Sequence, residues 1–235
     1  MADTLRGRLQ PLGAGTKGTA PRREYERRAP FGGAHGAMAT PERLAPVVRF
    51  IGDDPQATSN WANGSEGERR LALDLRRVLG ERAVLLHDRK VPGARGHVDH
   101  LAIAASGIWV IDAESDRGKV RGRDVGDSSL RDYRLYVGGR DRTRLIEQLA
   151  YQVKAVRSAL GSSELPVRAA LCFTDATWKL FARPSLFGDV CVTRPEALIR
   201  QIAAQGPLDK HDVLLVAIKL GETLTAAPIG PTFVA

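Results

Sequence analysis

The sequence predicts an α/β protein of the α+β kind, in which helices flank one central mixed sheet. Amphipathic helical patterns and short β-rich runs follow one another in the order α-β-β-β-α-β-β-α-α, which is typical of a mixed sheet covered by helices. The chain has 235 residues, of which 43% are hydrophobic. This is enough for one large domain with tails.

The first predicted element is a helix over residues 65–79. Ser65 and Glu68 have the spacing of a capping box, and Gly80 ends the helical pattern. Because they recur at helical spacing, four apolar residues are predicted to form the buried stripe of this helix: Leu71, Leu75, Val78 and Leu79.

Three β-rich runs follow, over residues 83–91, 97–105 and 107–115. Only the pair Ser106-Gly107 separates the last two runs, and so short a connection predicts a tight hairpin with antiparallel strands.

The second half of the chain starts with a run that ends at the glycine pair 138–139. A helix is then predicted over residues 143–161, and its buried face is expected to carry Leu145, Leu149, Val153 and Val156. The remaining predicted elements are strands at 167–175 and 189–193 and helices at 194–205 and 210–224.

The folded domain is predicted over residues 59–225, between a basic tail at 1–58 and a short tail at 226–235. The net charge is +8, and half of this excess lies in residues 1–40, which hold seven basic and three acidic side chains. A tail rich in Gly, Ala and Pro does not bury enough apolar surface to fold. Its charge suits a polyanion such as nucleic acid, and a simple spacer is the alternative.

We expect a cytoplasmic protein without a membrane segment. No apolar run approaches the 18–20 residues or so of a membrane span, and the first residues lack the apolar stretch of a secretory signal. The two cysteines, Cys172 and Cys191, form neither a disulfide framework nor a zinc-site spacing. Both are expected as reduced thiols in buried strands.

Carboxylates gather where the second and third β-rich runs are predicted to pair. Asp112 and Glu114 are two apart, so their side chains point to one face of a strand. Pairing through the Ser106-Gly107 turn places residues whose numbers sum to about 213 opposite each other, which brings Asp99 to the same face. Like charges there repel unless a cation lies between them. Oxygen ligands suit Mg²⁺ or Mn²⁺, and Glu68 is a possible fourth ligand.

The segments "GSEGERRLALDLRRVL", "GHVDHLAIAASGIWVIDA" and "RGKV" resemble the nuclease-related domain (NERD) family over about residues 60–165. That family is similar to the PD-(D/E)xK nucleases, so the resemblance implies a restriction-endonuclease-like fold. It also implies metal-dependent hydrolysis of phosphodiester bonds, with DNA favoured over RNA as the substrate. It implies that Asp99 and Asp112 ligate the metal and that Glu68 is an auxiliary acid. The glutamine of the later helix corresponds to Gln148 or, less well, to Gln152.

One residue departs from this family pattern. The family places a lysine two residues after the second acid, where this chain has Glu114. In one interpretation, Glu114 itself ligates the metal. In the other, hydrolysis is weakened or lost, and the domain only binds nucleic acid. Lys119 and Lys90 are candidate substitutes, although a solvated surface position explains each of them as well.

Three hypotheses follow. The chain is a metal-dependent nuclease acting through Asp99, Asp112 and Glu114 with Glu68 and Gln148, a nuclease-like module that binds nucleic acid without cutting it, or a structural domain whose acids are merely buried and paired. An arginine-rich stretch favours the first two, although a solvated surface explains it too. Its members are Arg121, Arg123, Arg131, Arg134, Arg140, Arg142 and Arg144.

Overall fold

The computed structural model describes residues 66–92, 96–126, 132–178 and 184–226. The predicted basic tail at 1–58 lies outside these ranges, as does nearly all of the predicted C-terminal tail. Ser65 of the predicted capping box is also outside them.

The main sheet has six strands in the order β1-β2-β3-β7-β10-β9. Strand β2 is antiparallel to both of its neighbours and β9 is antiparallel to β10, whereas β7 runs parallel to β3 and to β10. The predicted mixed sheet is therefore confirmed. Its strands are β1 (Ala83–Lys90), β2 (His97–Ala104), β3 (Gly107–Glu114), β7 (Val167–Phe173), β9 (Ser185–Phe187) and β10 (Val190–Thr193).

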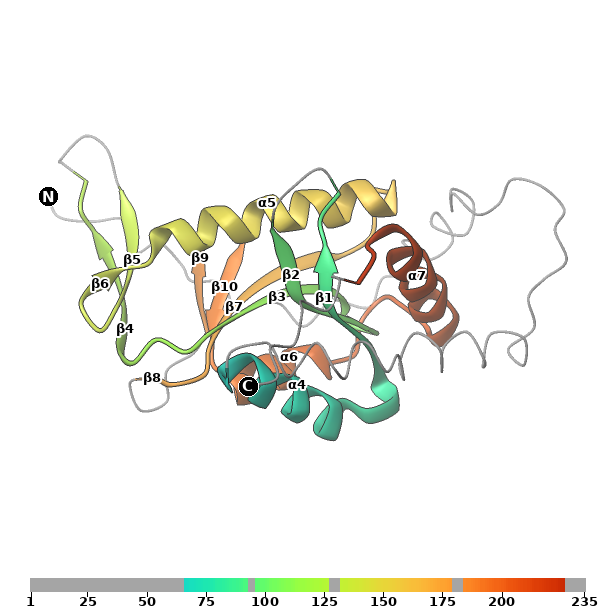
Figure 1. The fold of residues 1–235 in the computed structure, drawn as a ribbon, viewed down its shortest axis with the longest axis horizontal. Helices are drawn as coiled ribbons and strands as arrows, with labels where there is room; N and C mark the ends of the chain where they lie inside the picture. Colours follow the sequence, from blue (N-terminus) through green and yellow to red (C-terminus); the bar gives the residue numbers. More distant parts are fainter. Residues whose placement is uncertain (1–65, 93–95, 127–131, 179–183, 227–235) are drawn as a thin grey trace, which may run out of the picture. The chain divides into compact units, whose positions relative to one another are not determined.

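Helices cover both faces of this sheet (Figure 1). One face carries α4 and α6, which contact each other and the central strands, and the other carries α5 along β3 and β7. Helix α7 packs against α5, β1 and β2. This layered arrangement agrees with the restriction-endonuclease-like fold that the resemblance implies. The helices are α4 (Glu66–Leu79), α5 (Thr143–Leu160), α6 (Pro195–Ile202) and α7 (Lys210–Thr223), and a 3₁₀ turn at Gly80–Arg82 follows α4.

The row of Leu71, Leu75 and Leu79 holds α4 against the sheet, because residues four apart lie on one face of a helix. These side chains are fully or almost fully buried, and Trp109 belongs to the same apolar cluster. The assignment of Val78 to this stripe was wrong, since its side chain is 41% exposed. One residue of helix rotates a side chain by about 100°, which turns Val78 away from the sheet.

Helix α5 is buried where the sequence predicts, with a small shift along the chain. Leu149 and Val156 are buried, Leu145 and Val153 are half-buried, and Leu160 completes the buried row. Cys172 and Cys191 are free, buried thiols on β7 and β10, as expected.

The hairpin of β2 and β3 forms, but its register differs from the prediction by two. Ala104 pairs with Gly107 and His100 pairs with Ile111, so paired residue numbers sum to 211. The turn consists of Ala105 and Ser106, and Gly107, with a φ of 130°, is already the first residue of β3. The predicted pairing of Asp99 with residue 114 was therefore wrong. The pairing ends at His100 and Ile111, and Asp99 and Asp112 are the next residues on the two strands. A shift of two keeps every side chain on its face.

A second sheet was missed by the sequence analysis. It has the strand order β6-β5-β4-β8, in which β4, β5 and β6 follow β3 in the chain and β8 follows β7. The segment of β4, "GKVRGRD", has a single apolar side chain, so the alternation that identifies a strand is weak. Its strands are β4 (Gly118–Asp124), β5 (Tyr133–Val137), β6 (Arg140–Asp141) and β8 (Ala176–Thr177).

None of the helices in the described ranges combines the length and the apolar character that a membrane crossing requires.

We predict that Leu71→Ala lowers the free energy of unfolding by about 2–5 kcal/mol, because it opens a cavity beneath α4. Leu73→Ala on the same helix is the matched control. That side chain is 56% exposed, so its loss should change stability by no more than about 0.5 kcal/mol. Urea denaturation measures both, and equal effects of the two substitutions would contradict this packing of α4.

Candidate functional site

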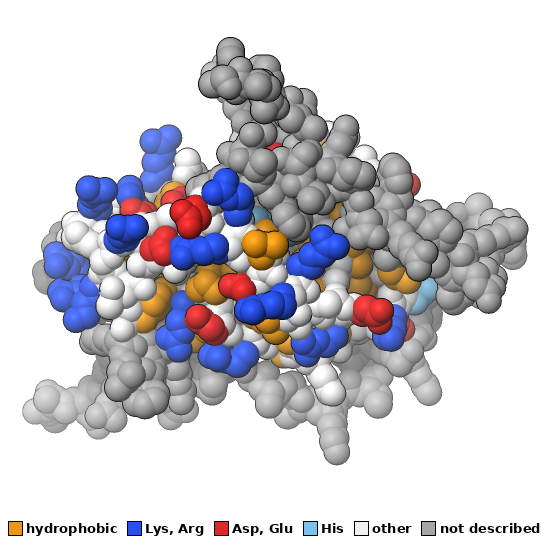
Figure 2. Space-filling model, turned by 60° about the horizontal axis from the view of Figure 1, so that its bottom comes forward, with side chains coloured by type: hydrophobic (Ala, Val, Ile, Leu, Met, Phe, Trp, Pro, Cys, Tyr) orange, Lys and Arg blue, Asp and Glu red, His pale blue; other side chains and the backbone are white. Residues whose placement is uncertain are grey.

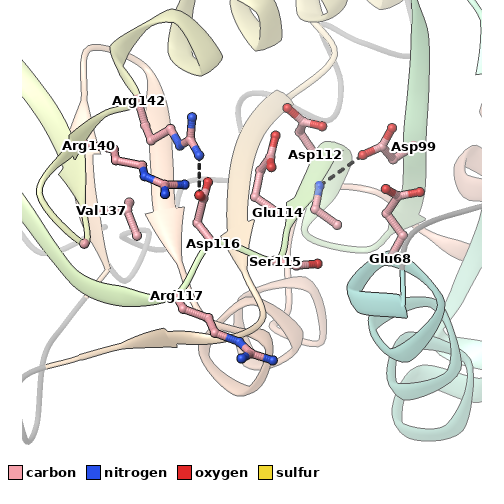
Figure 3. Close-up of a pocket in the computed structure, with 12 residues that line it drawn as sticks. Glu68, Asp99, Asp112, Glu114, Ser115, Asp116, Arg117, Val137, Arg140 and Arg142 are labelled. Atoms are coloured by element: carbon pink, nitrogen blue, oxygen red, sulfur yellow. Dashed lines mark hydrogen bonds and ion pairs between the residues drawn. The ribbon is translucent and has the colours of Figure 1, made fainter.

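A pocket of about 750 Å³ opens where β2 and β3 meet α4 and the second sheet (Figure 3). Most of the side chains around it are charged. Its lining residues are Glu68, Asp99, Asp112, Ala113, Glu114, Ser115, Asp116, Arg117, Val137, Gly138, Arg140 and Arg142.

The hairpin places the first two acids. Asp99 lies on β2 and Asp112 on β3, each directly next to the paired residues His100 and Ile111, so the hairpin brings both acids to the pocket. The N–H of Ala113 donates a hydrogen bond to Oδ2 of Asp99 (3.1 Å) and fixes that carboxyl group. Because alternate residues of a strand share a face, Glu114 follows Asp112 into the same pocket.

Glu68 comes from the first turn of α4 and points toward Asp99 and Asp112 (Figure 3). The close approach of this turn depends on Gly67. A Cβ atom on Gly67 would lie 2.4 Å from the Ser115 hydroxyl oxygen and 2.5 Å from that of Thr174. The missing side chain thus lets the helix end reach the segment that follows β3.

Two acids in this pocket, Asp99 and Glu114, resist ionisation. Burial raises the pKa of Asp99 well above its ordinary value, and the charge and hydrogen bond of Asp112 raise it further. Burial also raises the pKa of Glu114 to about 7, helped by Asp112 and Asp116 and opposed by Arg142. Burial is the larger cause of both shifts and the neighbouring carboxylates add to it, and a cation would offset this second contribution.

Arginines line the other side of the pocket. Arg140 and Arg142 lie across from Asp99 and Asp112, with Glu114 and Asp116 between the two groups (Figure 3). Nη2 of Arg142 donates to Oδ1 of Asp116, whereas Nε of Arg142 is buried and makes no hydrogen bond within the described residues.

Two glycines bring the arginines to the acids. Gly118 and Gly138 have φ values of 106° and 57°, and a Cβ on Gly118 would lie 2.5 Å from the Cα of Gly138. The β5–β6 turn therefore packs directly on the start of β4. From the sequence, the arginines were predicted only as part of a general basic stretch, although the glycines at 118 and 138 were a signal of close backbone approach.

Four of the five predicted site residues meet in the pocket: Glu68, Asp99, Asp112 and Glu114. The fifth, Gln148, is exposed on α5 and is not among the lining residues. Gln152 is half-buried, and its Oε1 is buried without a hydrogen-bond partner in the described part of the chain. Lys90 and Lys119, the predicted lysine substitutes, are exposed and outside the lining.

The histidines beside Asp99 have other partners. His97 is exposed and pairs with Asp88 (3.5 Å). His100 is buried and shares a hydrogen bond with His87 between their Nδ1 atoms (2.8 Å). Burial lowers the pKa of His100 to about 4, so this imidazole pair adds no charge to the site at neutral pH.

The donor chemistry fits a magnesium-like ion. Within the described ranges, no three His, Cys, Asp or Glu side chains are arranged around a common metal position. Mg²⁺ does not need such a cage, because it keeps several waters and binds through one or two carboxylates together with substrate phosphates. The paired carboxylates of Asp99 and Asp112, with Glu68 and Glu114 beside them, match that mode of binding.

We predict that Glu114→Gln changes the pH dependence of stability in EDTA. A carboxyl group whose pKa rises on folding stabilises the protein below its unfolded value, near 4.5, and this contribution is lost as the pH rises through about 7. After allowance for the partial exposure of Glu114, the substitution should improve stability at about pH 7.5, relative to about pH 5, by roughly 1–2 kcal/mol. Urea denaturation at both pH values tests this. Glu147→Gln, at an exposed site on α5, is the control, and parallel profiles for wild type and Glu114→Gln would contradict the prediction.

Comparison with known proteins agrees with this site. Residues 63–174 match the family model of the nuclease-related domain, and this range contains the helix, the hairpin and the arginines that form the pocket. No match was found among curated proteins or among solved structures. Over residues 63–174, the chain is therefore similar to the nuclease-related domain (NERD) family.

Proposed function

We propose that the pocket hydrolyses phosphodiester bonds of nucleic acid, DNA in the first place, with a divalent cation bound at Asp99 and Asp112. The observation that carries this proposal is the pairing of two aspartates, one of them with a strongly raised pKa, inside a pocket that arginines also line. The match of residues 63–174 to the nuclease-related domain supports the same class of substrate.

The charge balance of the lining supports a divalent cation. With all acids ionised, five carboxylates face three guanidinium groups, which leaves a formal charge of −2. A single Mg²⁺ or Mn²⁺ balances that charge. An unneutralised pocket of this kind would repel the phosphates of a nucleic acid.

Asp99 and Asp112 are the ligands of this cation in our proposal. The Ala113 N–H orients the Asp99 carboxylate, and the β2–β3 register holds Asp112 across from it. Glu114 and Glu68 lie on either side and hold ligand waters or complete the coordination. When bound, the cation lowers the pKa of water and polarises the phosphoryl oxygen.

Basic side chains gather at the end of the described structure that carries β4 to β6 (Figure 2). Lys119, Arg121 and Arg123 are exposed on β4, and the guanidinium of Arg123 lies 5.1 Å from the ring centre of Tyr136. Cations beside a substrate pocket favour a polyanion over a small neutral substrate.

Binding without hydrolysis is the second candidate function. It is favoured by the absence of any lysine from the pocket lining among the described residues, and by Glu114 in the family's lysine position. In this case the acids and the cation would hold a phosphate without activating water.

A first prediction concerns cation binding. Mn²⁺ at about 100 times its Kd should stabilise the protein by about 2.7 kcal/mol, which corresponds to about 5–10 °C in Tm for a protein of this size. Asp99→Asn should raise the Tm of the metal-free protein, because it removes a buried carboxylate that Asp112 repels, and should abolish the Mn²⁺ shift. Differential scanning calorimetry in EDTA and in Mn²⁺ measures both effects. A full Mn²⁺ shift in Asp99→Asn would exclude this cation site.

A second prediction concerns cleavage of labelled single-stranded DNA, double-stranded DNA and RNA in Mg²⁺ or Mn²⁺. Wild type should cleave DNA, and Asp99→Asn and Asp112→Asn should each lose about 100-fold or more of the rate, because the cation is no longer held. Asp74→Asn, on the exposed side of α4, is the control and should cleave like wild type.

Glu114→Lys separates the two candidate functions. Cleavage by this variant but not by wild type would mean that the site is intact except for Glu114. Metal-dependent DNA binding without cleavage by either protein would replace hydrolysis with the binding function.

A further inference from the structure

The arginine side of the pocket has donors that the protein itself leaves unused. Arg142 donates through Nη2 to Asp116, but its buried Nε has no partner within the described residues. A buried N–H without an acceptor is costly, so it favours a ligand that brings an oxygen to it. Asp116 thus positions the guanidinium without saturating it.

Arg140 has more unused hydrogen-bond donors than Arg142 among the described residues. Its side chain is exposed and lines the pocket, and the structure gives it neither a hydrogen bond nor an ion pair in the described part of the chain. It pairs with Val137 across the β5–β6 turn, and Val137 lines the same pocket. The side-chain direction of Arg140 therefore follows from the strand register.

Arg134 shows what a neutralised arginine on this sheet looks like. It lies on β5 and makes ion pairs with Asp132 (2.8 Å) and Asp141 (3.6 Å), and it is not among the lining residues. An arginine whose only role was to balance surface acids would be expected to resemble Arg134. Arg140 does not.

We propose that Arg140 and Arg142 form a phosphate-binding subsite, which holds a backbone phosphate of a nucleic-acid strand across the pocket from Asp99 and Asp112. The proposal takes the substrate class from the proposed function but does not require hydrolysis. Guanidinium groups bind phosphate oxygens through two parallel N–H donors, and two adjacent arginines match the several oxygens of one phosphate.

The position of the subsite sets its role. Glu114 lies between the arginines and the two aspartates (Figure 3). A phosphate held by the arginines is therefore near Asp99 and Asp112 but does not contact them directly. The close contact of Gly118 with Gly138 fixes this separation, because the turn that carries Arg140 does not move independently of β4. Acids and arginines thus act on one strand from opposite sides.

The test measures binding apart from cleavage. The anisotropy of a fluorescent single-stranded 20-mer DNA is titrated with the full-length protein in EDTA and then in Mg²⁺, at several salt concentrations. The variants are Arg140→Gln and Arg142→Gln, with Arg134→Gln as the matched control from the same small sheet. Arg142→Lys tests whether charge alone suffices.

We expect Arg140→Gln to weaken DNA binding about 3- to 10-fold and to reduce the slope of log K against log salt by about 1, as the loss of one phosphate contact does. Arg142→Gln should act in the same direction, Arg142→Lys should recover only part of the loss, and Arg134→Gln should bind like wild type. Because Arg140 is exposed and has no ion pair with any described residue, its substitution should leave the Tm unchanged. The test therefore stays valid if Arg142→Gln unfolds.

Three results would overturn the subsite: wild-type affinity and salt slope in Arg140→Gln, an equal loss in Arg134→Gln, or no DNA binding by wild type in either buffer. The two proposals fail separately. Loss of binding in Arg140→Gln without cleavage by wild type would retain the subsite and reject hydrolysis. If wild type cleaves DNA and Arg140→Gln changes neither the DNA affinity nor the cleavage rate, hydrolysis is retained and the subsite is rejected.

Discussion

The repulsion between Asp99 and Asp112 is the constraint on which the rest of the site depends. Two carboxylates on neighbouring strands are costly in the absence of a cation, because burial raises the pKa of Asp99 well above its ordinary value and the charge of Asp112 raises it further. The chain tolerates it because the hairpin is held between β1 and β7 and is packed from below by the leucines of α4. A site under electrostatic strain needs a rigid support, since otherwise its strands would move apart.

The sequence predicted this part of the molecule well because its signals are local. Alternation placed Asp112 and Glu114 on one face, and the short turn predicted the hairpin that brings Asp99 to them. The register was wrong by two, since Gly107 begins β3 instead of completing the turn, yet an error of two leaves the faces unchanged. The faces, and not the exact partners, determine which acids share the pocket.

The parts that sequence reasoning missed depend on contacts between distant segments. Strand β4 has too few apolar side chains to be predicted from its own sequence, and it becomes evident only from its pairing with β5. The position of Arg142 depends on the packing of Gly138 against Gly118. Gln148, in contrast, was predicted as a site residue but does not line the pocket. Its spacing on the helix suits a site residue, but the rotation of α5 leaves it exposed and turns Gln152 inward. Helical phase is set by tertiary packing, which a single sequence determines only approximately.

The two sides of the pocket limit its ligands in ways that neither side does alone. A cluster of carboxylates binds cations in general, and a pair of arginines binds anions in general. Placed across one pocket, they exclude a simple cation from the arginine side and a simple anion from the acidic side. A ligand that satisfies both must bring negative charge to Arg140 and Arg142 and share a cation with Asp99 and Asp112, and a phosphodiester does this with oxygens of one phosphate or of two successive ones. The arrangement of carboxylates on one side of the pocket and arginines on the other, more than any single residue, is therefore the physical basis for our proposal of phosphodiester chemistry.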